Sequence, residues 1–391
     1  MGSTGFATLA LLVAVGLAGP VLSAVPRLGA PLVIGEIAAG LVIGRSGFDL
    51  VAVDDPPLTL LSDIGFALLM LIVGTHLPLR RPGLRPALRR AAVAAALTAV
   101  LAAGGGLLLA RWTGLHHPDV LAVLIATSSA AVALPVISTL EDRPALLVVT
   151  TWVALLDVGT VLAVPLVVRQ GSLRAVLAGI VGVAVLAAVV FGLATRLRHH
   201  VWSVRLRDRS RERHWALDLR VSLVVLFGLA ALATRQHTSV LVPGFAAGAV
   251  LALLGEPRRL AEQLIGLGEG FLVPIFFVTL GARLRLTALG EPRNLVLAAS
   301  LAATATLVHV AVAAAVRLPL GAGLLATAQL GVPAAVASIG LTTGLLGAGQ
   351  AAAVLAAAVV SLGACSAGAA LLGHRDGTGD HTAAGRPVPA G

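Results

Sequence analysis

The stretch that decides the fold is ALLVVTTWVALLDVGTVLAVPLVV, residues 145–168, an apolar run with a single charged residue, Asp157, near its centre. The nearest arginines, Arg143 and Arg169, lie just beyond its two ends. A run of this length crosses a bilayer as one helix, and a carboxylate at mid-depth costs about 2.5–3.5 kcal/mol. A protein keeps such a group where it binds or pairs with something. We therefore expect Asp157 to bind an ion or a proton.

The rest of the chain has a similar composition. Its 391 residues are 58% hydrophobic and 12% charged, with a mean hydropathy of +0.98, unlike an ordinary soluble domain. Apolar runs follow one another without polar–apolar alternation, so we expect helices rather than a barrel. The composition excludes a soluble enzyme. Without a Gly-rich phosphate-binding loop, an ATP-driven pump is not expected either.

Hydropathy predicts an all-α polytopic membrane protein with about thirteen transmembrane helices. The expected spans are 5–24, 31–48, 59–78, 88–110, 119–140, 145–168, 172–195, 216–234, 239–255, 260–282, 294–316, 319–346 and 349–373. The first run lacks a basic segment before it, so we interpret it as a helix and not as a cleaved signal. The Gly-, Ala- and Pro-rich residues 374–391 predict a short disordered cytoplasmic tail.

Arginine supplies the positive charge, since the chain has no lysine and a net charge of +10. It gathers in the connections after the third, seventh and ninth spans, at Arg80, Arg81, Arg85, Arg89, Arg90, Arg196, Arg198, Arg205, Arg207, Arg209, Arg211, Arg213, Arg258 and Arg259. These connections lie on one side of the membrane, opposite the acidic loop 49–55. The positive-inside rule then puts the N-terminus outside and the C-terminus in the cytoplasm. The outer loop with Arg283, Arg285 and Arg293 disagrees weakly with this orientation.

Charge in loops does not predict a nucleic-acid partner, and the lone Cys365 excludes an internal disulfide or a cysteine metal cluster. We expect no cofactor and no fixed structural metal, and the partners expected from the residues are the lipid bilayer, protons and monovalent cations.

An internal repeat is visible. Short matches recur at a nearly constant offset, among them Ala130-Ala131-Val132 with Ala334-Ala335-Val336, and the Ala-Ala-Gly steps ending at Gly40 and Gly248. The matching helices are an odd number of spans apart, so the two halves are expected to be inverted in the membrane. We expect one transmembrane domain, 1–373, with inverted repeats at about 5–168 and 216–373 and a linker helix between them. Such repeats are typical of alternating-access transporters.

Several of these motifs resemble the sodium/hydrogen exchanger family, in the bacterial Kef-like branch of the cation:proton antiporters. They are the second-span run 27–44, residues 61–74, the Pro-Gly-Phe-Ala-Ala-Gly run 243–248 and the run 274–281. The ordered set covers about residues 5–370. The resemblance implies crossed, broken helices in a core that moves against a panel, or dimer, domain. It also implies a homodimer in the bacterial inner (cell) membrane.

In this resemblance Asp157 matches the aspartate that alternately carries a proton and a cation. The residues favour the same role, because loss of water disfavours the charged form of a carboxylate. The alternative is a structurally paired carboxylate. The run at Thr127, Ser128 and Ser129 resembles the broken helix beside that aspartate. Hydroxyls and unwound carbonyls suit a small cation, although such residues also serve as packing in membrane helices.

Three further candidates complete the predicted site. Gly331 and Pro333 lie in the repeat mate of the broken helix and are expected to interrupt it. His309 is alone in an apolar run, where the resemblance implies a possible charge partner for Asp157; hydrogen-bonded packing is an equal alternative. Glu36 could guard the inner cavity or simply reach the membrane interface.

The chain departs from the family pattern at Leu156, His76 and the Leu330-Gly331-Val332 triplet, where relatives carry more polar residues. The departures leave the transported ion open. We expect exchange of protons for Na⁺ or K⁺, electroneutral because one carboxylate remains at the core. The alternatives are a proton-coupled exporter of an organic compound on the same scaffold and a cation channel.

Overall fold

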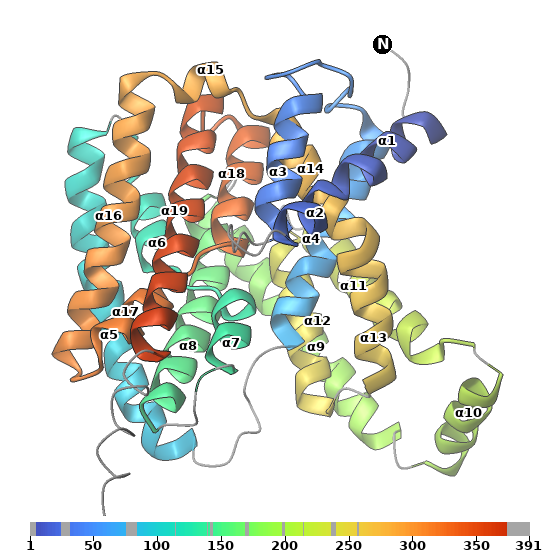
Figure 1. Ribbon diagram of the computed structural model, residues 1–391. Coiled ribbons are helices and arrows are strands. Elements are labelled where there is room, and N and C mark those ends of the chain that lie inside the picture. The colour runs from blue at the N-terminus through green and yellow to red at the C-terminus, as the bar shows by residue number, and fades with distance from the viewer. Residues whose placement is uncertain are drawn as a thin grey trace, which may run out of the picture.

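The computed structural model describes residues 5–24, 32–75, 84–113, 115–138, 140, 144–168, 172–197, 200–213, 215–235, 240–255 and 258–373. In that part of the chain all regular structure is helical (Figure 1). The predicted tail 374–391 lies outside the described residues.

The chain order begins with α1 (Phe6–Gly16), α2 (Ala18–Ser23), α3 (Leu32–Ile43), α4 (Pro56–Thr75), α5 (Leu84–Trp112), α6 (Pro118–Ala126), α7 (Ala130–Ser138), α8 (Pro144–Val167), α9 (Leu173–Leu197) and α10 (Val201–Glu212). It continues with α11 (Leu217–Arg235), α12 (Leu241–Leu254), α13 (Arg258–Leu267), the π-helix η1 (Gly268–Leu272), α14 (Val273–Arg283), α15 (Leu286–Leu289), α16 (Pro292–Ala315), α17 (Leu320–Ala326), α18 (Gly331–Thr343) and α19 (Ala348–Gly373).

Ten helical segments of the described residues are long and apolar enough to cross a membrane, and three shorter apolar helices accompany them. Each of the thirteen expected spans overlaps one of these segments. The three shorter segments are Leu32–Ile43, Pro118–Leu134, which contains the break between α6 and α7, and Leu241–Leu254. The protein is therefore an all-helical polytopic membrane protein, as predicted.

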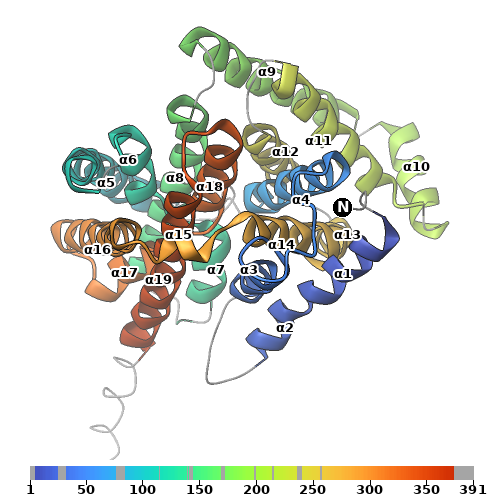
Figure 2. The ribbon, with the colours of Figure 1, turned by 90° about the horizontal axis from the view of Figure 1, so that it is seen from above.

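The helices form two groups, which Figure 2 shows side by side. α5, α6, α8, α16, α17 and α19 pack on one another in the first group. In the second, α3 packs on α14 and α4 packs on α12, with α9 and α11 along the outside. The broken pairs α6–α7 and α17–α18 bring their inner ends to the middle of the molecule (Figure 1).

Glycines set the closest approaches in the second group. A Cβ on Gly40 of α3 would overlap the carbonyl of Val278, and one on Gly281 of α14 would overlap the carbonyl of Ile37. Gly248 of α12 approaches the backbone of α4 in the same way, at Leu71. The small residues therefore let the helix backbones approach closely.

The structure differs from the expected helices in three places. The first span breaks at Leu17 into α1 and α2, and the span expected at 260–282 contains the π-helix η1. The arginine-rich connection after α9 forms a further helix, α10. Hydropathy could not predict α10, because it detects apolar runs, whereas arginine and glutamate favour a helix without being apolar.

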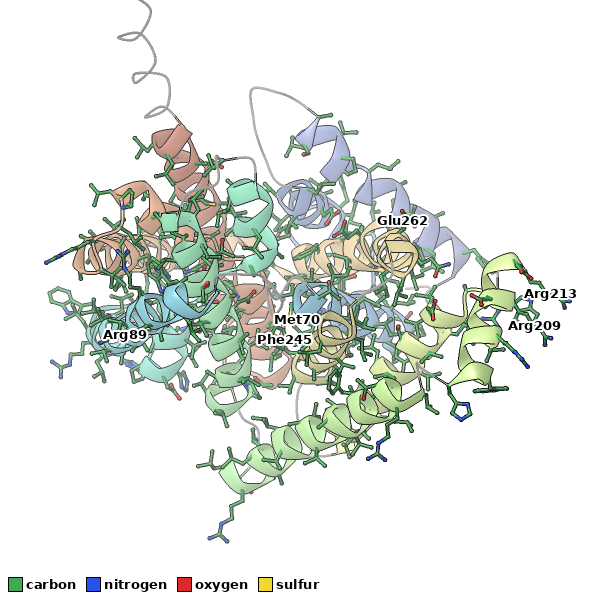
Figure 3. All side chains as sticks on the ribbon, turned by 90° about the horizontal axis from the view of Figure 1, so that it is seen from below. Met70, Arg89, Arg209, Arg213, Phe245 and Glu262 are labelled. Atoms are coloured by element: carbon green, nitrogen blue, oxygen red, sulfur yellow. The ribbon has the colours of Figure 1, made fainter. Side chains whose placement is uncertain are left out.

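The two ends of the bundle differ in charge. α1 begins at the end that carries the acidic loop 49–55, and α10 lies at the opposite end, where α19 finishes (Figure 1). In the view from that second end, Arg89 is labelled near one edge of the molecule, and Arg209 and Arg213 are labelled near the other (Figure 3). We call this second end the arginine end.

Candidate functional site

The site is built where two helices are interrupted. α6 stops at Ala126 and α7 starts at Ala130, while α17 stops at Ala326 and α18 starts at Gly331. The backbone N–H of Ser129 donates a 2.7 Å hydrogen bond to the carbonyl of Ala328. This bond joins the two breaks directly, and it satisfies buried backbone groups that would otherwise have no partner in the membrane.

Asp157 lies on α8 against the first of these breaks and is 4% exposed. Its Oδ2 accepts a 2.9 Å hydrogen bond from the backbone N–H of Ala130, the first residue of α7. The amino end of a helix carries a partial positive charge. The carboxylate therefore faces a favourable dipole although it is removed from water.

Several hydroxyl side chains belong to the two segments that this hydrogen bond joins, the break before α7 and the helix α8. The Thr127 and Thr160 hydroxyls are 3.1 Å apart, and Thr160 also donates to the carbonyl of Leu156 at 2.7 Å. Ser128 and Ser129 are buried, and Ser128 Oγ has no hydrogen-bond partner among the residues that the structure describes. A buried hydroxyl without a partner keeps a lone pair available for a ligand.

The second break is fixed by Gln329, which is 2% exposed. Its side-chain Nε2 donates to the carbonyl of Leu124 in the last turn of α6, at 3.0 Å, and its backbone N–H donates to Ser361 Oγ at 3.1 Å. Gln329 thus caps the broken end of the opposite helix. Sequence analysis did not assign this role, or the role of Thr160, although Thr160 follows Asp157 by one helical turn.

Gly331 and Pro333 were expected to interrupt their helix. They open α18 instead, and the interruption itself occupies residues 327–330. Pro333 is in the first turn, where a missing N–H costs no helical hydrogen bond. The expected break is therefore present, just before the residues that predicted it.

His309 lies fully buried on α16. Its Nδ1 is 2.8 Å from the carbonyl of Ala305, so Nδ1 carries a proton and donates. The ring centroid lies 5.7 Å from that of Trp152, and Nε2 has no hydrogen-bond partner in the described part of the chain. Among the described residues no hydrogen bond or ion pair joins His309 to Asp157. Two roles were expected for His309, a charge partner of Asp157 and hydrogen-bonded packing. The hydrogen bond to Ala305 corresponds to the packing role.

Glu36 is 4% exposed on α3. It packs under α2, where a Cβ on Gly19 would lie 2.9 Å from Glu36 Cγ. The side chain is therefore enclosed by α2 and is not exposed on the surface of the bundle. It lies in the second helix group, apart from the hydrogen bonds around Asp157.

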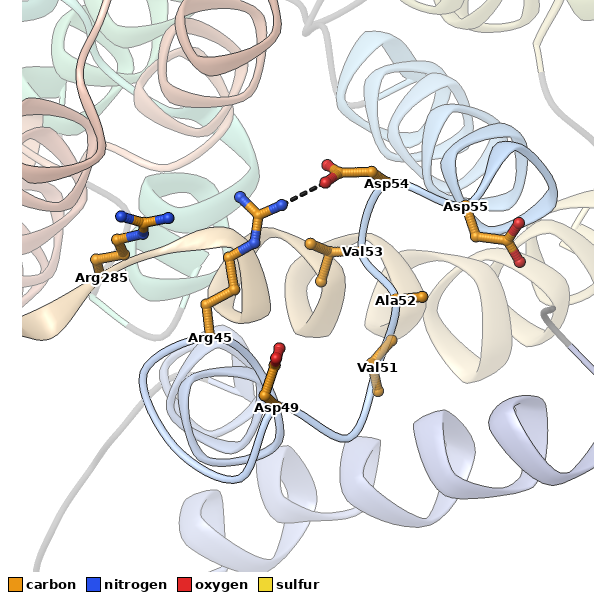
Figure 4. Close-up of a pocket in the computed structure, with 8 residues that line it drawn as sticks. All are labelled: Arg45, Asp49, Val51, Ala52, Val53, Asp54, Asp55 and Arg285. Carbon is orange, nitrogen blue, oxygen red and sulfur yellow. Dashed lines mark hydrogen bonds and ion pairs between the residues drawn. The ribbon is translucent and has the colours of Figure 1, made fainter. Parts of the chain in front are cut away.

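A separate polar cluster closes the acidic end (Figure 4). Its cavity of about 390 Å³ is lined by Arg45, Asp49, Val51, Ala52, Val53, Asp54, Asp55 and Arg285, and Arg45 is ion-paired with Asp54. Arg283 donates to the carbonyl of Val53 and to Thr59, both at 3.1 Å. Two of the three outer arginines that opposed the predicted orientation therefore lie against the acidic loop, Arg283 through these bonds and Arg285 in the lining of the cavity.

The residues around Asp157 offer one carboxylate and several hydroxyl and carbonyl oxygens, which are hard ligands suited to an alkali cation or a proton. Nowhere among the described residues do three His, Cys, Asp or Glu side chains form a group able to hold a metal ion. The arrangement can therefore bind a small monovalent ion through a single charge.

A comparison with protein families decides the assignment. Residues 9–371 match the transmembrane sodium/hydrogen exchanger family. The chain belongs to the sodium/hydrogen exchanger family. Members of this family are multi-pass membrane transporters and not enzymes. The resemblance inferred from the motifs is confirmed.

Individual relatives of this exchanger chain are distant. It is 25% identical over 336 residues to the putative Na(+)/H(+) antiporter YjbQ of Bacillus subtilis, covering 79% of this chain and 52% of that protein. It is 26% identical over 278 residues to the glutathione-regulated potassium-efflux system protein KefC of Enterobacter sp., covering 69% and 44%. The chain thus spans about half the length of these two curated relatives.

The fold has a match among solved structures. The sodium proton antiporter MjNhaP1 of Methanocaldococcus jannaschii superposes with a TM-score of 0.60 at 16% identity, over 93% of this chain and 96% of that one. At this identity the match establishes the fold of this exchanger-family chain.

Proposed function

We propose that this chain exchanges protons for a monovalent cation, Na⁺ or K⁺, and that Asp157 carries both in turn. The proposal is supported above all by the position of Asp157: its carboxylate is buried and bound to the backbone N–H of Ala130 at the amino end of α7, directly after the buried residues Thr127, Ser128 and Ser129 of the helix break. Family membership supports antiport as the activity.

A single carboxylate couples the two fluxes by competition. When Asp157 is protonated, its charge is neutralised and a cation loses its main ligand. When it is ionised, a cation can bind with oxygens of Thr127, Ser128 and Ser129 as further ligands. Only a protonated or cation-loaded Asp157 is neutral enough for the site to change the side of the membrane that it faces. With an empty, ionised Asp157 the site does not change sides. One proton then exchanges for one cation, without net charge movement.

The moving parts are proposed to be the two helix groups. Repeats at about 5–168 and 216–373, with α9 as the linker region between them, would each supply one broken helix to the core. The surface between α3 and α14 on one side and α18 and α19 on the other is apolar, lined by Val33, Ile34, Ile37, Phe277, Leu330, Ala334, Leu355, Ala358, Val359 and Leu362. Such a surface has no hydrogen bonds to break when the core shifts, which favours alternating access.

The orientation stays a proposal: N-terminus outside, and the arginine end facing the cytoplasm of a bacterial cell. A homodimer is proposed from the family resemblance. His309 as a charge partner and Glu36 as a cavity group are retained as secondary proposals. If His309 pairs with Asp157 in another state, its free Nε2 is the atom available for that contact.

The test is exchange in proteoliposomes with an imposed pH gradient. Na⁺, K⁺ and Li⁺ are added in turn to wild type, to Asp157→Asn and to Asp208→Asn, an exposed carboxylate on α10 that serves as the matched control. We expect one cation to dissipate the gradient in wild type and in Asp208→Asn but not in Asp157→Asn. Exchange that survives in Asp157→Asn contradicts the carrier assignment.

A second candidate function is proton-coupled export of an organic compound. Leu156, Leu330 and Val332 motivate it, because these apolar residues stand where relatives carry polar groups. Alkali cations would then leave the gradient intact in wild type, and the chain would confer resistance to a toxic organic cation. A cation channel is the third candidate, and it would conduct without moving protons.

A further inference from the structure

A second cavity lies at the arginine end and shares no residue with the hydrogen bonds around Asp157. It has a volume of about 580 Å³ and opens between the start of α5 and the end of α16. Its lining residues are Arg89, Arg90, Val93, Ala315, Val316 and Arg317. Arg89 marks its place at the outer edge of the bundle (Figure 3). Three guanidinium groups and three apolar side chains thus share one hollow.

The rim of the cavity is held in place by Arg90. Its guanidinium donates to the carbonyl of Val316 at 2.6 Å and to the carbonyl of Arg317 at 3.4 Å. These bonds tie the beginning of α5 to the end of α16. Arg317 itself has a φ of 57°, in the left-handed region that non-glycine residues rarely adopt. The backbone at Arg317 is therefore held in one conformation by the hydrogen bonds from Arg90.

The positive charge in this cavity is not neutralised by the part of the chain that the structure describes. Among the described residues an ion pair joins Arg45 and Asp54, and it lies at the acidic end, opposite this cavity. Neither Arg89 nor Arg317 has a side-chain hydrogen bond among the described residues, and no acidic residue lines the cavity. Arginines arranged in this way bind phosphate oxygens with paired, charge-assisted hydrogen bonds.

The apolar part of the cavity continues along the membrane-facing surface. Arg89, Val93, Leu97 and Val100 follow one another at helical spacing, so they share one face of α5. The three apolar residues are 48%, 37% and 69% exposed, and Leu307 of α16 is 68% exposed. A ligand with a phosphate head and a hydrocarbon chain would contact the arginines and this surface together. Free phosphate would use only the arginines.

We propose that this cavity binds the phosphate group of an anionic phospholipid, with an acyl chain lying along α5 and α16. Basic pockets between transmembrane helices are suited to such headgroups. The site is on the helix group proposed to carry Asp157. A bound lipid would therefore anchor that group to the leaflet at the arginine end.

The test measures thermal unfolding of delipidated protein in a neutral detergent. Dioleoylphosphatidylglycerol, dioleoylphosphatidylcholine and inorganic phosphate are each titrated into wild type and into Arg89→Gln/Arg317→Asn. Asparagine is chosen at 317 because it tolerates a left-handed φ. We expect phosphatidylglycerol to raise the unfolding temperature of wild type well above the other two additives. The double variant should bind it about 30-fold more weakly, at about 1 kcal/mol for each arginine.

The matched control is Arg205→Gln/Arg209→Gln on α10, which removes the same charge from the same end of the molecule. It should keep its apparent affinity within about twofold, because general surface attraction is not the effect proposed. Equal losses in the two double variants would overturn the site, and so would equal stabilisation by inorganic phosphate. If the Arg89→Gln/Arg317→Asn protein does not fold, Arg89→Gln alone is tested, with about fivefold weaker binding expected.

Discussion

Ser129 and Ala328 are joined through their backbones, N–H to carbonyl, over 2.7 Å. One belongs to the break between α6 and α7 and the other to the break between α17 and α18. This bond therefore fixes the two helix breaks against each other, next to the point where Asp157 accepts its hydrogen bond from Ala130. The predictions below start from this junction.

Replacement of Ser129 by proline removes the N–H that Ala328 accepts. A buried carbonyl left without a donor costs about 1–3 kcal/mol, so Ser129→Pro should lower the thermal stability of the purified protein and abolish exchange. Ser129→Ala keeps the backbone bond and should change stability far less. Equal stability of the two variants would show that the junction does not hold the breaks together.

The hydroxyl pair Thr127–Thr160 tests the ligand set. Thr160→Val keeps the shape of the side chain and removes the partner of the Thr127 hydroxyl. We expect Thr127→Val and Thr160→Val each to raise the KM for the cation by about tenfold, about 1.4 kcal/mol, and the double variant to be little worse than either. Fully additive effects would indicate that the two hydroxyls act independently.

Gln329 caps the broken end of α6. Gln329→Leu removes the donor to the Leu124 carbonyl and should destabilise the protein by about 1–3 kcal/mol, measured by thermal unfolding. The control is Gln350→Leu. The Gln350 side chain also makes one hydrogen bond to the backbone, accepting from the N–H of Gly347, but this bond is exposed. Its loss should cost at most about 0.5 kcal/mol. A larger loss in the control than at Gln329 would contradict the capping role.

The contact between α3 and α14 tolerates no side chain at Gly40. Gly40→Ala would force the Cβ into the carbonyl of Val278 and separate the helices, so it should destabilise the protein by about 1–3 kcal/mol. Gly192→Ala on α9 meets nothing within 4 Å and should be neutral or stabilising by up to about 1 kcal/mol. Comparison of the two unfolding temperatures checks the packing directly, and a stable Gly40→Ala protein would refute it.

Much of this fold could be predicted from the sequence because membrane-spanning helices are long apolar runs that hydropathy detects. Each expected span overlaps an apolar helical segment. The break at Thr127 and the break before Gly331 were also predicted, from hydroxyl, glycine and proline residues in apolar runs. These signals are local, and a bilayer leaves few other ways to satisfy the backbone.

The interactions across the site could not be predicted in the same way. Gln329 contacts Leu124 across 205 positions of the chain, and no periodicity encodes that pairing. The position of His309 beside Trp152 is likewise a product of tertiary packing. α10 was missed for another reason, since its arginines favour a helix without an apolar signal.

The central claim is that Asp157 holds either a proton or a cation. The most direct measurement is proton release when Na⁺ or K⁺ is added to the detergent-solubilised protein in weakly buffered solution. The account predicts that wild type releases protons in proportion to the cation bound, and that Asp157→Asn releases none. Release that persists undiminished in Asp157→Asn would place the exchange at another residue and contradict the account.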